Sequence, residues 1–205
     1  TVTAPDGLNQ SVTVNYSSNT NAGTASASAS FVATANYLAS SANTTFTIDK
    51  AATTTAVTCG AGPFTYTGSA QTPCSATVTG PGLSLTPAVS YSNNTNAGTA
   101  VASYSYAGAA NYLTSSDNKS FTINKANPTL SVSNSPATYD GTAKTATVTS
   151  STAGTASNIK YGGSGTAPTN AGTYAVKANF VPTDATNYNS LTDVAAGNGV
   201  INKAT

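Results

Sequence analysis

The sequence predicts an all-β fold, and two observations support this prediction. Apolar residues alternate with polar residues in almost every short run, for example at Val12, Val14 and Tyr16, and again from Tyr174 to Phe180. Alternation with period two is typical of strands with one buried face, and β-branched Thr and Val fill many of the positions between. No window carries an apolar stripe at the helical period over a helical length. We therefore expect strands, and not helices, to build the core.

Three landmarks recur in the same order along the chain. The first is Asn-Ala-Gly-Thr, the second is an Asn-Tyr pair, and the third is a strand end in which Lys follows Ile by two residues. They lie at Asn21–Thr24, Asn96–Thr99 and Asn170–Thr173, at Asn36-Tyr37, Asn111-Tyr112 and Asn187-Tyr188, and at Ile48–Lys50, Ile123–Lys125 and Ile201–Lys203. A period of about 75 residues is too long for a solenoid turn and suits small modules that each close a core. The chain is therefore predicted to be a tandem array.

The period predicts one partial and two complete modules. The partial module covers residues 1–51, and the complete modules cover residues 52–126 and 127–205; we call these ranges the first, second and third repeats. Because Thr1-Val2-Thr3 aligns with Thr77-Val78-Thr79, we expect the first repeat to lack two initial strands. Two interpretations remain open. Either the segment begins at an arbitrary point of a longer array, or a strand from a neighbouring chain completes the open sheet.

The second repeat shows the expected element order. Strands are predicted at residues 54–59, 64–67, 76–79, 86–92, 99–107 and 120–124. Short strands separated by Gly and Pro indicate a two-sheet sandwich of immunoglobulin-like character, and a mixed sheet with one short helix across residues 109–116 is the alternative. The connectors at Lys50–Ala52 and Lys125–Asn127 are very short, so the modules are predicted to form an elongated, semi-rigid rod.

Each Asn-Ala-Gly-Thr sequence predicts a turn before a long strand. Asn tolerates turn conformations, and Gly adopts the positive φ that other residues avoid. Gly23, Gly98 and Gly172 are therefore interpreted as structural turn residues, with a positive φ expected at Gly98 and Gly172.

Cys59 and Cys74 are the two cysteines of the chain. Their spacing is not that of a Cys-x-x-Cys metal or redox motif, and there is no His to complete a zinc site. A disulfide is favoured because a module of this size has a marginal core, and closing such a loop is worth about 3 kcal/mol. Two free buried thiols are the alternative. A disulfide would imply an oxidising compartment outside the cytoplasm.

The composition argues against several classes of function. Charged residues make up 6% of the chain, the net charge is +1, and His is absent. A Ser-His-Asp triad is therefore impossible, the six Asp residues do not recur as pairs, and no oxygen-ligand cluster typical of calcium sites occurs. Scattered Lys residues do not form a nucleic-acid surface, and no apolar run is long enough for a spanning helix. We expect no enzyme activity, metal, cofactor, nucleic-acid partner or membrane insertion within this segment.

Two recurring side chains are candidates for a function. Tyr37, Tyr112 and Tyr188 are either exposed platforms for a sugar ligand or core residues whose hydroxyl groups bind nearby backbone; recurrence favours the second interpretation. The Lys residues at the strand ends, Lys50, Lys125 and Lys203, are either junction surface residues or participants in a Lys-Asn isopeptide bond, and the first interpretation is favoured.

The motifs resemble those of MBG-type and related bacterial immunoglobulin-like repeats of large surface proteins. The resemblance rests on Cys74–Gly80, Val89–Tyr91, Asn96–Thr99, Ala110–Tyr112 and Phe121–Ile123, and on Tyr139–Gly141 with Asn170–Tyr174 in the third repeat. It covers the whole chain and implies an extracellular, cell-surface or secreted location, but it supplies no catalytic residues.

Two functions follow from this pattern. The first is a structural stalk or fibre segment that displays or builds an adhesive assembly, with neighbouring modules, and in a filament other copies, as partners. The alternative is a module that binds carbohydrate or a partner protein.

Overall fold

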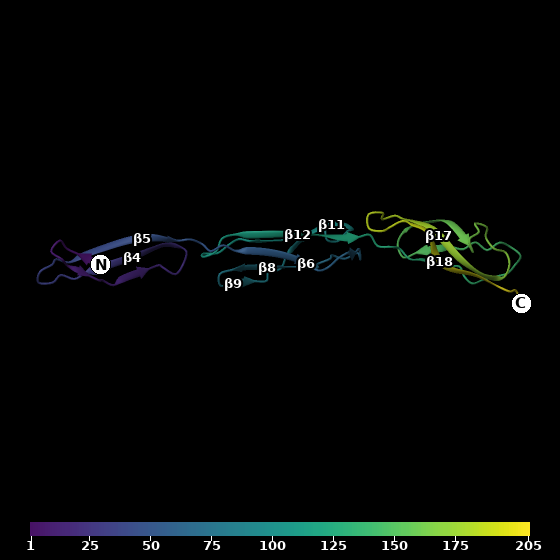
Figure 1. Ribbon diagram of the computed structural model, residues 1–205. Helices are drawn as coiled ribbons and strands as arrows, with labels where there is room; N and C mark the ends of the chain where they lie inside the picture. The colour runs from purple at the N-terminus through teal and green to yellow at the C-terminus, as the bar shows by residue number, and fades with distance from the viewer. The chain divides into compact units, whose positions relative to one another are not determined.

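The structure is a computed structural model that describes residues 1–205, and it is built of strands without any helix (Figure 1). The all-β prediction is thus confirmed. The alternative with a short helix across residues 109–116 is wrong, because Ala109 and Tyr112 close a tight turn through an antiparallel bridge and strand β12 begins at Ser115.

The third repeat contains two sheets. One pairs β13 (Leu130–Val132) with β15 (Val148–Ser150), and the other has the order β14 (Ala137–Thr138), β18 (Leu191–Asn202), β17 (Gly172–Pro182) and β16 (Gly154–Tyr161). The larger sheet contributes buried Tyr161, Val176 and Ala196. Leu130 and Val148 of the smaller sheet pack against them, so the two sheets enclose a core as in a β-sandwich.

The second repeat also contains two sheets. One has the order β6 (Thr54–Cys59), β8 (Cys74–Gly80) and β9 (Leu83–Leu85), and the other has the order β10 (Ser90–Ser92), β11 (Gly98–Tyr106), β12 (Ser115–Asn124) and β7 (Phe64–Thr65). Buried Val57 and Val78 alternate with more exposed neighbours, as do Ala100 and Ile123, which is the predicted period. Strand β9 is not predicted by the sequence pattern, and β12 begins earlier than the predicted residue 120.

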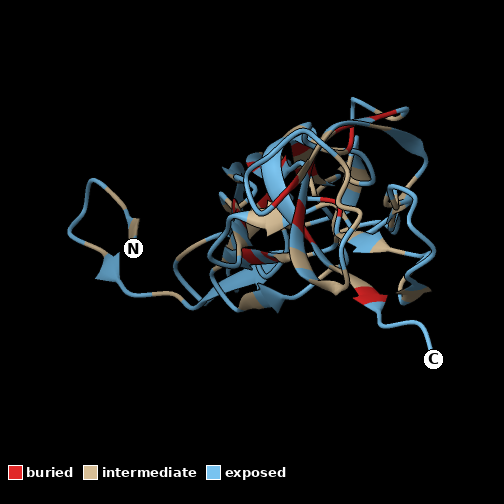
Figure 2. Cartoon of the chain, turned by 90° about the vertical axis from the view of Figure 1, so that its right-hand side faces the viewer, coloured by how far each residue is buried: buried red, intermediate tan, exposed pale blue.

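The first repeat has fewer strands. A hairpin pairs β1 (Val2–Thr3) with β2 (Asn9–Gln10), and a three-stranded sheet has the order β3 (Val14–Ser17), β4 (Gly23–Phe31) and β5 (Ser40–Ile48). This repeat has no counterpart of β6 or β7. Its buried residues are Ala25 and Phe31, and Figure 2 shows the N-terminal hairpin without a buried residue.

The chain divides into two compact units. The first comprises residues 1–58, 74–90 and 103–119, and the second comprises residues 59–73, 91–102 and 120–205. The boundary between them therefore runs through the second repeat. Each unit contains one of the two places where a repeat follows another. The division into three modules remains a prediction.

Cys59 and Cys74 are joined in a disulfide, as the sequence predicts. The bond links the end of β6 to the first residue of β8, and the backbone beside it is paired as well, because the Gly60 N–H donates to the Pro73 oxygen at 2.9 Å. The loop that carries β7 is thus closed at its base. The third repeat has no cysteines and closes its equivalent loop without a covalent link.

The turn glycines differ between repeats. Gly23 and Gly98 have φ of 136° and 137°, and this matches the expectation for Gly98. The expectation for Gly172 is wrong, since its φ lies outside the left-handed region. In the third repeat the Tyr174 hydroxyl donates to the oxygen of Asn170 at 2.9 Å and closes the turn locally. No positive φ is then needed at Gly172.

The position of the aromatic side chain in this layer also differs between the repeats. In the first repeat Ala25 of β4 lies opposite Phe46 of β5. In the third repeat Tyr174 of β17 occupies the position that matches Ala25, and it lies opposite Gly199 of β18. The aromatic ring has moved from one strand to the next, which conserves part of the volume in this layer of the core.

Candidate functional site at the junctions between repeats

The recurring landmarks meet where one repeat follows another. At the first junction, Asn111 of the second repeat reaches the Asn-Ala-Gly-Thr turn of the first. Its Oδ1 accepts a hydrogen bond from the Ala22 N–H at 2.8 Å, and its Nδ2 donates to Oδ1 of Asn21 at 2.9 Å. One amide group thus satisfies a backbone donor and a side-chain acceptor of the preceding repeat.

The second junction repeats this arrangement. Oδ1 of Asn187 accepts from the Ala97 N–H at 2.8 Å, and its Nδ2 donates to Oδ1 of Asn96 at 3.3 Å. Asn187 is only 6% exposed, one of the few buried polar residues of the chain. A buried amide with both its oxygen and its nitrogen bonded specifies one arrangement of the two repeats at this contact.

The connecting backbone adds two hydrogen bonds at each junction. Ala51 donates its N–H to the Asn111 oxygen at 2.8 Å and accepts from the Leu113 N–H at 2.9 Å. Ala126 does the same with the oxygen of Asn187 and the N–H of Asn189, both at 2.9 Å. The connector is therefore paired like a strand, as the parallel bridges Ala51–Tyr112 and Ala126–Tyr188 record.

A tight turn presents Asn111 at this contact. Ala109 and Tyr112 exchange backbone hydrogen bonds of 3.1 and 3.3 Å across the turn. Gly108 precedes it with φ of 81°, and a Cβ atom there would lie 2.9 Å from the Tyr112 oxygen. A residue with a side chain at position 108 would therefore force the loop to shift.

The Lys residues at the strand ends cross the same junctions. Nζ of Lys50 donates to the Ala109 oxygen at 2.9 Å, and Nζ of Lys125 donates to the Ala185 oxygen at 2.6 Å. Each ammonium group is thus bound by a backbone carbonyl of the following repeat. This geometry agrees with the interpretation of these residues as junction lysines.

Asp184 supports the second junction alone. Its Oδ1 accepts from the N–H groups of Thr186 and Asn187, and its Oδ2 accepts from Nδ2 of Asn187 at 2.9 Å. These hydrogen bonds, led by the one from the Asn187 side chain, lower the pKa of Asp184. The matching position in the second repeat is Gly108, so the first junction has no such carboxylate.

The three candidate tyrosines lie beside the junction loops and are half-buried. The hydroxyl of Tyr112 donates to the Pro81 oxygen at 2.8 Å, and that of Tyr37 donates to Oδ2 of Asp6 at 2.9 Å, a hydrogen bond that raises the pKa of Tyr37. Tyr188 packs edge to face on Tyr66, with ring centroids 5.4 Å apart. Tyr37 and Tyr112 therefore each fix a loop of their own repeat, whereas Tyr188 of the third repeat packs on a ring of the second. A role in ligand contact stays a hypothesis.

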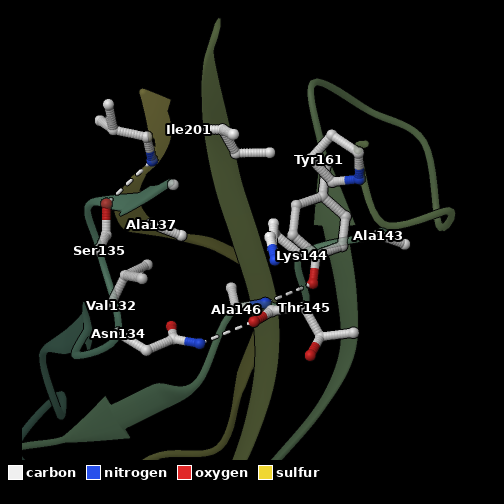
Figure 3. Close-up of a pocket in the computed structure, with 13 residues that line it drawn as sticks. Val132, Asn134, Ser135, Ala137, Ala143, Lys144, Thr145, Ala146, Tyr161 and Ile201 are labelled. Atoms are coloured by element: carbon white, nitrogen blue, oxygen red, sulfur yellow. Dashed lines mark hydrogen bonds between the residues drawn. The ribbon is translucent and has the colours of Figure 1, made fainter. Parts of the chain in front are cut away.

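A pocket of about 230 Å³ lies in the third repeat (Figure 3). Its polar groups already have partners within the protein: the Tyr161 hydroxyl accepts from the Ala146 N–H at 2.7 Å, and Ser135 Oγ accepts from the Val200 N–H at 2.9 Å.

The pocket exists because the third repeat lacks two aromatic rings that the second repeat has. Ala137 lies opposite Ile201 in the parallel pair of β14 and β18, where the second repeat places Phe64 opposite Ile123. Gly199 likewise stands where the second repeat has Phe121. The pocket is thus a space that the second repeat fills with two aromatic side chains.

The structure gathers no group of three His, Cys, Asp or Glu side chains suited to a metal ion. It also contains no helix of the length and apolarity needed to cross a bilayer. The chemistry of the junctions is that of hydrogen bonding between amide, carbonyl and ammonium groups.

The sequence analysis identified the recurring Asn-Tyr pair, but it proposed the Tyr as the candidate functional residue and not the Asn. The residues that join the repeats are Asn111 and Asn187, and the signal was the recurrence of Asn directly before each Tyr. The roles of Ala22 and Ala97 carry no side-chain signal, because both contribute a backbone N–H.

Comparison with known proteins supports the repeat type. Residues 128–205 match the model of the MBG domain family, so this part of the chain is similar to MBG-type repeats. The match covers the range that the sequence landmarks assign to the third repeat. No curated protein and no solved structure matches the chain.

Proposed function

We propose that this chain is a structural segment of an extracellular surface protein, a stalk or fibre whose repeats follow one another as a rod that displays or builds an adhesive assembly. The observation that carries the proposal is the recurrence of the same junction contacts at Asn111 and Asn187. The most regular sequence motifs of the chain form contacts between its repeats. Such contacts serve a mechanical role, whereas ligand binding does not require them.

The mechanism is restriction of movement between repeats. Each junction combines five hydrogen bonds: two from the side-chain amide of the Asn, two between backbone groups and one from the Lys ammonium group. A single hydrogen bond of this kind contributes about 1 kcal/mol net, so several that must break together limit swivelling more than a three-residue linker does. The disulfide and the MBG-type repeat support a location outside the cytoplasm.

The proposal is tested with the double variant Asn111→Ala/Asn187→Ala and the control variant Asn36→Ala. NMR relaxation of backbone amides reports how each repeat tumbles. We expect the original chain and the control to tumble with coupled repeats, and the double variant to show faster, independent tumbling. Independent tumbling in the original chain would refute a stiffening role for the junctions.

The pocket of the third repeat favours a second candidate function, binding of a partner protein or a carbohydrate. Its apolar wall includes Val132, Ala146 and Ile201, and Lys144 adds a cation that is paired with Asp140. Because the second repeat fills the same space with Phe64, a ring-shaped apolar group from a ligand would fit there. Replacing Ala137 by Phe should abolish any such binding, measured by calorimetry, without unfolding the repeat.

A further inference from the structure

The pocket of the third repeat has room for an aromatic ring that the second repeat supplies itself. In the second repeat the rings of Phe64 and Phe121 pack edge to face, with centroids 5.7 Å apart. In the third repeat Ala137 and Gly199 stand at these two positions, and both line the pocket. The space therefore follows from two small residues within the third repeat.

The size of the pocket suits a single ring. Its volume of about 230 Å³ is smaller than the roughly 300–1,000 Å³ of pockets that hold drug-sized ligands. An apolar cavity of about 150 Å³ is already large enough to bind benzene. A phenyl group with a short attachment therefore fits into this pocket, and an oligosaccharide does not.

The lining of the pocket favours an aromatic ring over a sugar ring. Val132, Ala137, Ala146 and Ile201 line it with apolar side chains. A sugar would bring several hydroxyl groups against these side chains without hydrogen-bond partners, which is unfavourable. A phenyl ring has no such groups, and its transfer from water to an apolar wall is favourable.

Two hydroxyl groups in the lining add hydrogen-bond donors. The Tyr161 hydroxyl accepts from the Ala146 N–H at 2.7 Å, and Ser135 Oγ accepts from the Val200 N–H at 2.9 Å (Figure 3). Because a hydroxyl group that accepts a hydrogen bond keeps its own proton, each can also donate to an acceptor of a ligand. Tyr161 is 7% exposed, so such a hydrogen bond would be shielded from water. The carbonyl groups that flank a side chain in a polypeptide are acceptors of this kind.

The pocket opens beside loops and not along a sheet edge. Asn134, Ala143 and Thr145 line it and are exposed. Strand β18 is paired with β14 on one side and with β17 on the other, so an added strand cannot bring a side chain into this space. A ring that enters the pocket must therefore come from a loop or turn of its own protein.

We propose that this pocket binds a phenylalanine side chain on a loop or turn of a partner protein. The ring takes the space that Phe64 fills in the second repeat, and the carbonyl groups beside it accept hydrogen bonds from the lining hydroxyl groups. An aromatic side chain buried in a pocket is a common anchor of protein interfaces. The inference rests on the second candidate function, binding at this pocket, and selects a partner protein over a carbohydrate.

The test titrates the isotope-labelled full chain with N-acetyl-L-phenylalaninamide, which carries the ring and both flanking carbonyl groups. We expect saturable NMR shifts of the amides of Ala137, Ala146 and Val200, with a dissociation constant of about 1 mM. The D enantiomer should bind at least about threefold more weakly, because its carbonyl groups are directed differently from the ring. The amides of Phe64 and Ile123, where the space is filled, are the internal control and should not shift.

Two variants close the pocket in different ways. Ala137→Phe places the ring of the second repeat in it, and Ala143→Trp covers its exposed mouth, so each should weaken binding at least about tenfold. The matched control Ala195→Phe adds the same ring at an exposed position outside the pocket and should leave binding unchanged. The amide spectrum of each variant shows whether the third repeat is folded.

Three results would overturn the inference. If neither the probe nor glucose saturates up to about 20 mM, the inference fails together with the second candidate function. If glucose binds as tightly as the probe, the inference fails while the second candidate function stands with a carbohydrate as ligand. If the D enantiomer and toluene bind as tightly as the probe, the pocket takes free aromatic compounds and not a residue of a protein. None of these results involves the junction contacts, so the structural role is tested separately.

Discussion

The first and second repeats place the same residues in different surroundings. Tyr16 and Phe46 of the first repeat match Tyr91 and Phe121 of the second, and both pairs pack edge to face at nearly the same distance. Yet Phe46 is 39% exposed and Phe121 is 8% exposed. The same ring pair thus forms within both repeats, whereas the burial of Phe121 also depends on Phe64 of β7, which packs on it in the second repeat.

The third repeat shows another solution to the same packing problem. It has no ring at the positions of Phe64 and Phe121, and Ala137 and Gly199 at these positions line a pocket; Tyr174 lies on the neighbouring strand, opposite Gly199. The sheet order and the parallel pairing are the same as in the second repeat. The second and third repeats therefore share their backbone pairing and differ in the aromatic side chains of the core.

The largest expected effect separates Phe46 from Phe121. Replacing Phe121 by Ala should cost about 3–5 kcal/mol of unfolding free energy in the second repeat, because a buried ring leaves a cavity. Replacing Phe46 by Ala should cost much less, since that ring is already partly in water. Hydrogen exchange of amides in β11 and in β4 measures the two losses separately. Equal losses would show that the exposure of Phe46 does not reduce its contribution to the core of the first repeat.

A smaller effect is expected from the disulfide. The double variant Cys59→Ser/Cys74→Ser should destabilise the second repeat by about 3 kcal/mol, because the loop that carries β7 is then free in the unfolded chain. Phe121 should become more exposed as β7 loosens, so the second repeat would approach the state of the first. Chemical denaturation of the original chain, before and after reduction of the disulfide, and of the variant tests this. The third repeat has no cysteines and is the internal control. An unchanged transition would mean that backbone pairing with β12 and side-chain packing hold β7 without the disulfide.

The sequence predicted the strands because their alternation is local. It also predicted the repeats, since Asn-Ala-Gly-Thr and Asn-Tyr recur whole, and that division stays a prediction. It failed at Gly172, where Tyr174 replaces an Ala and closes the turn in another way. Asn111 and Ala22 are far apart in the sequence, so no local pattern predicts the hydrogen bond between them. The junction became visible only when the fold brought two recurring motifs together.

The junction asparagines should have intermediate effects. Replacing Asn187 by Ala leaves the Ala97 N–H without its acceptor and should cost about 1–3 kcal/mol of local stability. Replacing Asn36 by Ala should cost nothing measurable in residues 1–205, because that side chain is exposed. Hydrogen exchange of the Ala97 amide measures this local stability directly. Protection of this amide in the Asn187→Ala variant would contradict the assigned contact.

A further comparison concerns the turn glycines. Gly98→Ala should cost about 1 kcal/mol, because a side chain is strained at the φ of 137° observed there. Gly172→Ala should cost less, since its φ is not positive and the added Cβ would meet the Tyr174 ring at 3.4 Å. Thermal unfolding of the two single variants gives the difference. Equal shifts in melting temperature would show that the two turns share one conformation.

The smallest expected effect is a pH dependence that distinguishes the two junctions. The hydrogen bonds from Asn187 and Thr186 hold the pKa of Asp184 below its ordinary value. A group with a depressed folded pKa stabilises the fold above its unfolded pKa, and this contribution is lost as pH falls through the folded value. The second junction should therefore loosen below about pH 4, while the first, with Gly108 in place of the carboxylate, should not.

The amides of Ala97 and Ala22 report the two junctions in one NMR titration from neutral to acid pH. The Ala97 resonance should move as Asp184 is protonated, and the variant Asp184→Asn should abolish that movement. If the Ala22 resonance moves equally, the acid response belongs to the chain as a whole, and Asp184 does not set the difference between the junctions.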